Sequence, residues 1–430
     1  MVIGCISYTT ARIYLHHGTE TVDVERSTPE QRLKEAKMYQ PCQLDRMYQL
    51  PKLQKIHTWK SRRKASPQSI SIITQLSLER LSMLRSQCRI WTDKISAVLY
   101  IPFMKNFGVI SEDVRAVNGS SMQDVAVFVE SFYQKLEKEG QCALDLQIVV
   151  EKFESWDDPN IGLYPFNAVR NRALMMVDTD VVILLDADFL PSQELSLMYK
   201  EKDSYSDLLH VLDKKTAYVL PAFQTLNNGV DGVNLAKKTA SHGKEDIVDA
   251  WHDGTVQGFQ LDQYSAGHGP TRYEQWLTAQ EPYSIAYEKG FEPYIMVARK
   301  FVPWYDERFR GYSRNKIVHL THLAEQLGVK MQVHDRGFVI HTPHSKASTF
   351  ARTKETGQWD TLLDLYIKVR RDISVGEFVP VTSFAKHCPK MIKAENLIKV
   401  IKKKLKIKRE KRIARQKSRK EIAKSKSKNV

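Results

Sequence analysis

Two carboxylates, Asp186 and Asp188, are the residues of this 430-residue chain whose types and spacing best suit chemistry. They follow the apolar run Val181 to Leu185, which is typical of a strand buried on both faces of a parallel α/β sheet. Such sheets bind ligands at the carboxyl ends of their strands. Two carboxylates one residue apart at that end share a face and can hold a divalent cation together. A cation held there can neutralise the charge of a diphosphate.

The same spacing occurs a second time in Asp178-Thr179-Asp180. That copy precedes the apolar run, at the end where open α/β sheets do not usually place ligands, so we interpret it as a loop entering the strand. Asp-x-Asp is also common in turns and helix caps. Position in the sheet, rather than composition, therefore favours Asp186 and Asp188.

The elements that must position these acids alternate between strand and helix from residue 69 onward. Period-2 and continuous apolar patterns predict strands over residues 70–76, 95–101, 144–150, 181–185, 216–223, 294–302 and 338–340. Helical spacing predicts helices over residues 77–91, 125–139, 167–176 and 315–327. This alternation indicates an α/β fold with a mainly parallel sheet flanked by helices. Between residues 224 and 269 the pattern weakens, which predicts a binding region built from loops.

The net charge of +15 is concentrated at one end of the chain. Residues 401–430 contain fifteen Lys or Arg and two Glu, a charge of +13, so the other 400 residues carry 15 − 13 = +2. A nearly neutral body makes nucleic acid an unlikely partner. The basic tail, with apolar residues at helical spacing over 397–407, fits an amphipathic helix on an anionic membrane surface. A nuclear or nucleic-acid address and a solvated, partly disordered end are the alternatives.

Three parts are expected along the chain. Residues 1–67 are polar and proline-punctuated and predict a poorly ordered N-terminal extension, residues 68–372 predict the folded domain, and residues 373–430 predict a C-terminal extension with the basic tail. The five cysteines form no C-x-x-C pair, which argues against a structural zinc site and leaves one or two disulfides open. No apolar run reaches the ~18–20 residues of a membrane span, and residues 1–15 are a poor signal peptide.

Several motifs resemble glycosyltransferase family 49, which includes the LARGE-type glucuronyltransferase domain. The matching segments occur in order over residues 164–173, 185–191, 267–271, 291–294, 305–316 and 337–341. The resemblance implies a GT-A fold, a UDP-sugar as donor, a glycan or glycoprotein as acceptor, and inversion at the anomeric carbon. It also implies a Golgi protein with an N-terminal anchor, although this chain has no recognisable one.

In the family, an acid pair holds the metal, so the resemblance assigns Asp186 and Asp188 to Mn²⁺. His341, at the end of the last predicted strand, is the natural third ligand, and His344 is a competing candidate. Oxygen ligands with one imidazole suit Mn²⁺ better than zinc. Asp186 is also expected to contact the nucleotide sugar.

Arg170 and Asn171 match an Arg-Asn pair that precedes the acid strand in the family, so the resemblance assigns both residues to binding of the nucleotide sugar. A guanidinium there can bind diphosphate or fix a loop, and an ordinary helix surface is the alternative. His268 and Trp276 are expected to line a sugar, because an aromatic face suits apolar sugar C–H groups. Core packing is the alternative for Trp276.

An inverting displacement needs one carboxylate to accept the proton of the acceptor hydroxyl. Several GT-A families place this acid where the present chain has Asn315-Lys316. We therefore expect Asp306 or Glu292 as the base, with Glu307 next. A structural ion pair with Arg308 is the alternative for these acids.

Two rival functions use parts of the same pattern. Phosphatases with an aspartyl nucleophile also place Asp-x-Asp at a strand end, but usually on the first strand and followed by Thr or Val, whereas residues 189–191 are Phe-Leu-Pro. A non-catalytic glycan-binding pseudoenzyme is the second alternative. A third possibility is a binding protein that functions mainly through the basic tail, but the nearly neutral charge of the other 400 residues does not support it.

Overall fold

The computed structural model describes residues 50–111, 120–344 and 349–384. The basic tail with its predicted amphipathic helix lies outside these residues, as do residues 1–49 of the N-terminal extension. Within the described part of the chain, no helix is both long enough and apolar enough to cross a membrane.

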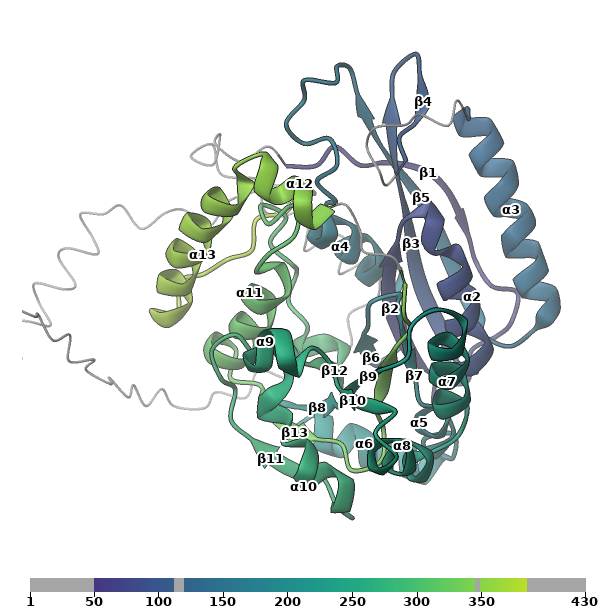
Figure 1. Ribbon diagram of the computed structural model, residues 1–430, viewed down its shortest axis with the longest axis vertical. Coiled ribbons are helices and arrows are strands. Elements are labelled where there is room, and N and C mark those ends of the chain that lie inside the picture. Colours follow the sequence, from purple (N-terminus) through teal and green to yellow (C-terminus); the bar gives the residue numbers. More distant parts are fainter. Residues whose placement is uncertain (1–49, 112–119, 345–348, 385–430) are drawn as a thin grey trace, which may run out of the picture.

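A ten-stranded sheet forms the centre of the molecule, with strand order β1-β5-β3-β2-β6-β12-β8-β13-β11 and β4 paired to β3 (Figure 1). Its strands are β1 Gln54–Trp59, β2 Ile70–Leu76, β3 Lys94–Met104, β4 Gly108–Val109, β5 Ala143–Phe153, β6 Val181–Leu184, β8 Thr216–Leu220, β11 Tyr283–Ile285, β12 Tyr294–Ala298 and β13 Lys330–Val333. The central run β5-β3-β2-β6 is parallel, and β12 enters antiparallel between β6 and β8. The predicted α/β fold, mainly parallel at its centre, is confirmed.

Helices cover both faces of this sheet. Among them are α2 Leu81–Ile90, α3 Met122–Glu139 and α4 Phe166–Met176. Successive strand residues point to opposite faces, so Ile72 packs with α2 and α3 whereas Ile73 packs with α4. This alternation explains why the strands are apolar throughout.

A second sheet of four strands, in the order β10-β9-β14-β7, stands beside the first. Its strands are β7 Phe189–Pro191, β9 Ala222–Thr225, β10 Val256–Gly258 and β14 Val339–His341. The single strand predicted over residues 216–223 is divided at Pro221, where the chain passes from β8 in the main sheet to β9 in the second. Proline lacks the N–H that a continuous ladder needs.

The prediction of a loop region between residues 224 and 269 is wrong, because most of these residues are helical. It contains α7 Gly229–Ser241, α8 Lys244–His252 and α9 Leu261–His268. Their periodicity is weak in the sequence because they bury small residues; α7, for example, buries Gly232, Ala236, Thr239 and Ala240. The predicted helix over 315–327 is also divided, into α11 Asn315–Thr321 and a π-helical turn over His322–Gln326.

Described residues on both sides of the predicted folded domain, 68–372, pack on it. Strand β1 precedes residue 67 and pairs with β5, and its Trp59 stacks on Tyr133 of α3. At the other end, α12 Thr349–Glu355 and α13 Gln358–Ser374 are followed by a segment that packs on the domain. There the Val381 carbonyl accepts a hydrogen bond from the Glu307 N–H, 2.8 Å away.

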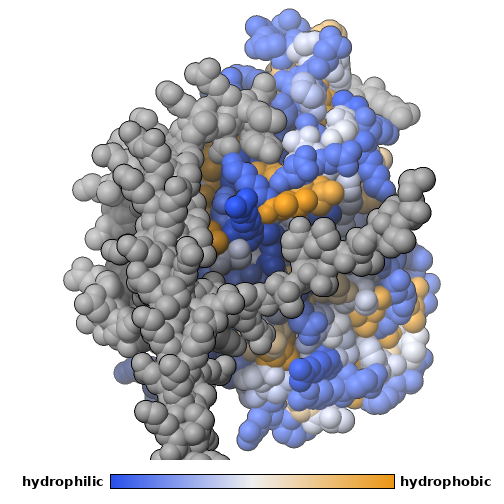
Figure 2. All heavy atoms as spheres, turned by 90° about the vertical axis from the view of Figure 1, so that its left-hand side faces the viewer, coloured by the Kyte–Doolittle hydropathy of each residue, from blue (hydrophilic) through white to orange (hydrophobic). Residues whose placement is uncertain are grey.

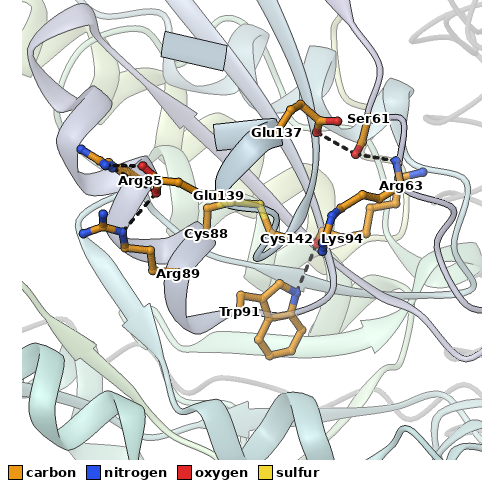
Figure 3. Close-up of a disulfide and its surroundings, with 10 residues drawn as sticks. All are labelled: Ser61, Arg63, Arg85, Cys88, Arg89, Trp91, Lys94, Glu137, Glu139 and Cys142. Atoms are coloured by element: carbon orange, nitrogen blue, oxygen red, sulfur yellow. Dashed lines mark hydrogen bonds and ion pairs between the residues drawn. A yellow bond between two sulfur atoms is a disulfide. The ribbon is translucent and has the colours of Figure 1, made fainter. Parts of the chain in front are cut away.

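A disulfide joins Cys88 of α2 to Cys142, just before β5 (Figure 3). Both cysteines are buried. Beside them, Glu139 of α3 is paired with Arg85 and Arg89 of α2. The covalent link and these ion pairs hold α2 against the end of α3 and the start of β5.

Candidate active site

The turn between β6 and β7 carries Asp186 and Asp188 at the carboxyl end of β6, as the sequence predicted. Gln87 of α2 fixes this turn, because its Nε2 atom donates to the carbonyls of Asp186 (3.0 Å) and Phe189 (2.7 Å). Strand β7 then pairs with β14, with Phe189 opposite His341. That pairing brings a histidine from far along the chain to the acid turn.

Asp188, His341 and His344 form one cluster, whose potential metal-ligating atoms all lie within 4.8 Å of one another. The Oδ2 atom of Asp188 lies 3.0 Å from Nε2 of His344 and 3.7 Å from Nε2 of His341. The Thr342 N–H donates to the Asp188 carbonyl and so fixes the segment between the two histidines. Burial opposes ionisation of Asp188, but its hydrogen bonds to both imidazoles lower its pKa, so the carboxylate is charged.

Asp186 lies beside this cluster but its oxygens have other partners. Arg170 contacts Oδ1 at 2.9 Å, while Lys316 at 3.0 Å and the Tyr294 hydroxyl at 3.1 Å contact Oδ2. Burial alone would raise the pKa of Asp186; the charges of Lys316 and Arg170 lower it to about 2. The structure thus brings Asp186 near the predicted metal site without placing it in the three-residue cluster.

Arg170 is buried in α4 rather than displayed on a helix surface. Its Nη1 atom donates to Asn315 Oδ1 at 2.7 Å, and its guanidinium lies 5.5 Å from the ring centres of both Phe166 and Tyr305. These contacts hold the guanidinium rigidly against Asp186. A side chain preorganised in this way keeps a positive charge at the acid turn.

Asn171 uses its whole side-chain amide inside the protein. Its Nδ2 atom donates to the Tyr305 carbonyl and to Glu307 Oε1, both at 2.9 Å, and its Oδ1 atom accepts from the Tyr305 N–H. The structure therefore gives Asn171 a role in fixing residues 305–307. The side chain of Asn171 therefore does not contact the acid pair.

Two of the three acids considered as the base are internal. Asp306, whose side chain is 0% exposed, is bonded by Arg308 Nη2 at 2.6 Å and by Arg308 Nε at 2.9 Å. Glu307 accepts from Asn171 and from the Ser383 N–H. The ion pair with Arg308, which was the alternative role for Asp306, is present. Solvent does not reach the carboxylate of Asp306 or of Glu307.

Glu292 has a different environment. It lies two residues before β12, with its N–H donating to the Gly267 carbonyl at 2.9 Å. Within the described part of the chain, no hydrogen bond or ion pair engages its carboxylate, which is partly exposed. Burial raises its pKa and the nearby charge of Asp186 adds to this, while Lys316 and Arg170 act in the opposite direction. Of the predicted bases, Glu292 is the one open to a ligand.

His268 lines the same region and Trp276 does not. The His268 ring lies between Phe259 (5.3 Å) and Tyr294 (6.0 Å), and Phe259 also contacts His341. Burial, with the charge of Lys316, lowers the pKa of His268 to about 3, so its ring is neutral. Trp276 is fully buried and donates to the His334 carbonyl, which makes it a core residue.

Lys316 is a site residue that the sequence motifs did not predict. It opens α11, and besides contacting Asp186 its Nζ atom lies 4.1 Å from the centre of the Tyr294 ring. With Arg170, Asp186, Tyr294 and Tyr305 it lines a cavity of about 20 Å³, which is room for about one water molecule.

Known proteins with similar sequences identify the family of this chain. The chain matches the family model described as "Glycosyl-transferase for dystroglycan" over residues 69–368. The chain belongs to this family. The resemblance to glycosyltransferase family 49 drawn from the motifs is thereby confirmed, and the family is one of sugar-transferring enzymes.

Individual relatives in this glycosyltransferase family match 72% of the chain. Xylosyl- and glucuronyltransferase LARGE2 of Homo sapiens is 30% identical over 309 residues, which is 72% of this chain and 37% of the relative. LARGE2s of Gallus gallus is 29% identical over 310 residues, covering 72% and 36%. The chain thus spans about a third of the length of these relatives. Among solved structures, S. aureus TarS residues 1–349 match with a TM-score of 0.30 and 11% identity, covering 72% of this chain and 70% of that one.

Proposed function

We propose that this protein is a metal-dependent glycosyltransferase that moves a sugar from a UDP-sugar to a glycan hydroxyl with inversion. One observation carries the proposal: Asp188, His341 and His344 converge within 4.8 Å beside the cationic residues Arg170 and Lys316. A metal and two fixed positive charges at one strand end are what a diphosphate leaving group requires.

The three-residue cluster fits a divalent metal. The Oδ1 atom of Asp188 is buried and has no hydrogen-bond partner among the described residues, so one carboxylate oxygen remains available. One carboxylate and two imidazoles suit Mn²⁺ and leave coordination positions open for phosphate oxygens. When bound, Mn²⁺ would supply Lewis-acid neutralisation of the diphosphate charge.

Lys316 and Arg170 are proposed to bind the diphosphate side of the donor. Arg170 is locked by Asn315 and by two aromatic rings, whereas the side chain of Lys316 is 16% exposed and lies on the accessible side of Asp186. Asp186 would orient both cations rather than coordinate the metal. His268, neutral and enclosed by rings, is placed to contact the sugar without repelling a cation.

Glu292 is proposed as the general base. Its carboxylate takes the proton of the acceptor hydroxyl while that oxygen bonds to the anomeric carbon from the face opposite the diphosphate. The bond from the anomeric carbon to the diphosphate oxygen breaks and UDP departs with the electron pair, so configuration is inverted. The raised pKa of Glu292 makes it a stronger base than a solvated glutamate.

The direct test is donor turnover. The protein is incubated with Mn²⁺ and a panel of UDP-sugars that begins with UDP-glucuronate and UDP-xylose, because the relatives are named xylosyl- and glucuronyltransferases. We expect release of UDP with at least one donor, and its loss in Asp188→Asn. His242→Ala, an exposed histidine on the C-terminal side of α7, is the matched control. Phosphatase activity without any nucleotide sugar, or donor binding without turnover under all conditions, would favour the rival functions.

A Golgi location is proposed for this enzyme. Besides the family resemblance, the buried disulfide between Cys88 and Cys142 supports it, because structural disulfides persist in oxidising compartments. Mass spectrometry of the protein alkylated in intact cells, before reduction, tests this: the disulfide peptide pair should be recovered from the secretory fraction. Recovery of both cysteines as alkylated thiols would contradict a luminal location.

A further inference from the structure

The segment that follows α13 lies against the loop between β12 and α11. We call residues 377–384 the C-terminal strap. The strap lies beyond residue 368, where the match to the family model ends. Seen from the side of α12 and α13, the described surface is largely hydrophilic (Figure 2). The strap nevertheless buries Phe378, which packs with α11 and α13, and places Phe384 edge to face with Trp304 at 5.2 Å between ring centres.

Two further contacts hold the start of the strap to the π-helical turn after α11. The Nε2 atom of Gln326 donates to the Phe378 carbonyl at 2.9 Å, and the ring of His322 lies edge to face with that of Phe378, with centres 4.8 Å apart. The strap is thus bound to the continuation of α11, the helix whose first residues, Asn315 and Lys316, belong to the candidate active site.

Glu307 binds the strap through both its backbone and its side chain. Its N–H donates to the Val381 carbonyl at 2.8 Å, and its Oε2 atom accepts from the Ser383 N–H, also at 2.8 Å. The other carboxylate oxygen, Oε1, accepts from Nδ2 of Asn171 in α4 at 2.9 Å. Glu307 is only 2% exposed, and hydrogen bonds are stronger away from water. One buried carboxylate therefore links the strap to α4.

From Asn171 the contacts continue to the guanidinium of Arg170. Asn171 binds both polar groups of the Tyr305 backbone, since its Nδ2 atom donates to the carbonyl at 2.9 Å and its Oδ1 atom accepts from the N–H at 2.8 Å. The centre of the Tyr305 ring lies 5.5 Å from the Arg170 guanidinium. The same ring stacks on that of His319, with centres 3.6 Å apart and planes 9° from parallel. Tyr305 is therefore fixed at its backbone and at its ring, and it limits the positions that Arg170 can adopt.

A carboxylate suits the position of Glu307 better than any uncharged side chain of its size. Both groups that bind its oxygens, the amide of Asn171 and the N–H of Ser383, are donors. Glutamate offers two acceptor oxygens to these two donors, whereas glutamine offers one oxygen and one NH₂ group that would face a donor. The role of Glu307 is therefore to join two segments of the chain.

We propose that Glu307 is a positioning residue through which the C-terminal strap holds Arg170 in place for the diphosphate of the donor. This rests on the proposed function, in which Arg170 binds that diphosphate. Arg170 has further supports in Asn315 and Phe166, so loss of the strap would displace the guanidinium without releasing it. The expected consequence is weaker binding of the nucleotide.

Ser383→Pro tests the link in the full chain while the buried carboxylate stays intact, because proline lacks the N–H that bonds Glu307. Ser383→Ala keeps this N–H and is the matched control. Calorimetry with UDP and Mn²⁺ should show binding about tenfold weaker for Ser383→Pro, because a small displacement of a positioning group can have an effect of this size. Ser383→Ala should retain most of the affinity. Mn²⁺ alone should bind equally to all three proteins, since the contacts from the strap lead to Arg170.

Glu307→Gln breaks the same link from the other side. It should weaken UDP binding as much as Ser383→Pro does, and the double variant should bind no more weakly than either single variant, because substitutions within one hydrogen-bond network are not additive. Additive losses would overturn the proposal. So would unchanged UDP affinity in both single variants, even if they unfold at lower urea concentration, because Glu307 would then have a structural role alone.

Hydrogen exchange measured by mass spectrometry tests the coupling without any ligand. In Ser383→Pro, faster exchange should extend from the strap to residues 303–311 and to residues 166–173 of α4. Faster exchange confined to residues 377–384 would overturn the proposal. Failure of the wild-type protein to bind UDP would count against the proposed function, and the exchange pattern would still decide whether the strap positions Arg170.

Discussion

The Nε2 atom of His344 lies 3.0 Å from Oδ2 of Asp188. This contact is shorter than the 3.7 Å that separates the same oxygen from His341, the histidine that the sequence favoured. Both imidazoles therefore belong to one candidate metal site, and neither is an isolated structural histidine.

Replacing His344 should impair metal binding as strongly as replacing His341. We expect either His→Ala change, or Asp188→Asn, to weaken Mn²⁺ at least about tenfold, because a three-ligand set loses one of its members. Electron paramagnetic resonance of free Mn²⁺ measures this without turnover. The three-residue assignment fails if His344→Ala binds Mn²⁺ like the wild type while His341→Ala does not.

The rate of transfer should rise with pH along an acidic limb set by Glu292. A general base works only when deprotonated, and burial raises the pKa of Glu292 above its ordinary value of 4.5, so activity is lost as pH falls through that raised pKa. Glu292→Gln should lower kcat about 10²- to 10⁴-fold. The pH profile of kcat at saturating donor is the measurement.

Lys316→Gln should change the pH dependence that Glu292 produces. The ammonium of Lys316 lowers the pKa of Glu292, so its removal should move the acidic limb to higher pH. The donor KM should rise as well, since a positive charge beside Asp186 is lost. An acidic limb at the same pH as in the wild type would argue that Glu292 is not the titrating group.

Asp306→Ala should destabilise the folded protein without abolishing sugar transfer. Asp306 and Arg308 form a buried ion pair, and deleting one partner of such a pair costs about 3–5 kcal/mol. The double variant Asp306→Leu with Arg308→Met should recover much of that loss in urea unfolding. A kcat reduced a thousandfold in Asp306→Asn at unchanged stability would instead restore Asp306 as the base.

Loss of the disulfide should weaken both the fold and the acid turn. Cys88 and Cys142 are separated by 54 positions, and closing a loop of that size stabilises the folded state by about 4 kcal/mol in the chain-entropy model. Cys88→Ala with Cys142→Ala should therefore unfold at lower urea concentration. Because the neighbouring Gln87 holds the Asp186 turn, Mn²⁺ affinity should fall too. Unchanged Mn²⁺ affinity in the folded variant would show that α2 does not transmit this constraint.

The sequence located much of the site because the signals were local. An apolar run ending in two acids predicts a strand and its carboxyl end, and β6 confirms both. His341 is the last residue of its short strand, β14, as expected. These predictions depend on periodicity over a few residues, which a single sequence contains.

Local patterns in the sequence do not predict contacts between distant segments. Lys316 occupies a position where several GT-A families have an acid, and the motifs do not predict that its ammonium pairs with Asp186. Asn171 matched a motif, yet its amide serves residues 305–307. The antiparallel entry of β12 between β6 and β8 had no counterpart in the strand pattern, because periodicity does not encode strand direction.

The pairing of β6 with β12 has a mechanical consequence. Leu184 lies opposite Ile295 in that antiparallel register, so the turn with the acid pair and the segment with Glu292 emerge from adjacent strands of one rigid sheet. Phe350, Lys354 and Trp359 lie instead on α12 and α13, near the end of the described part of the chain. Substitutions in α12 and α13 should therefore leave the spacing between the acid turn and Glu292 unchanged, because neither helix contributes a strand to that part of the sheet.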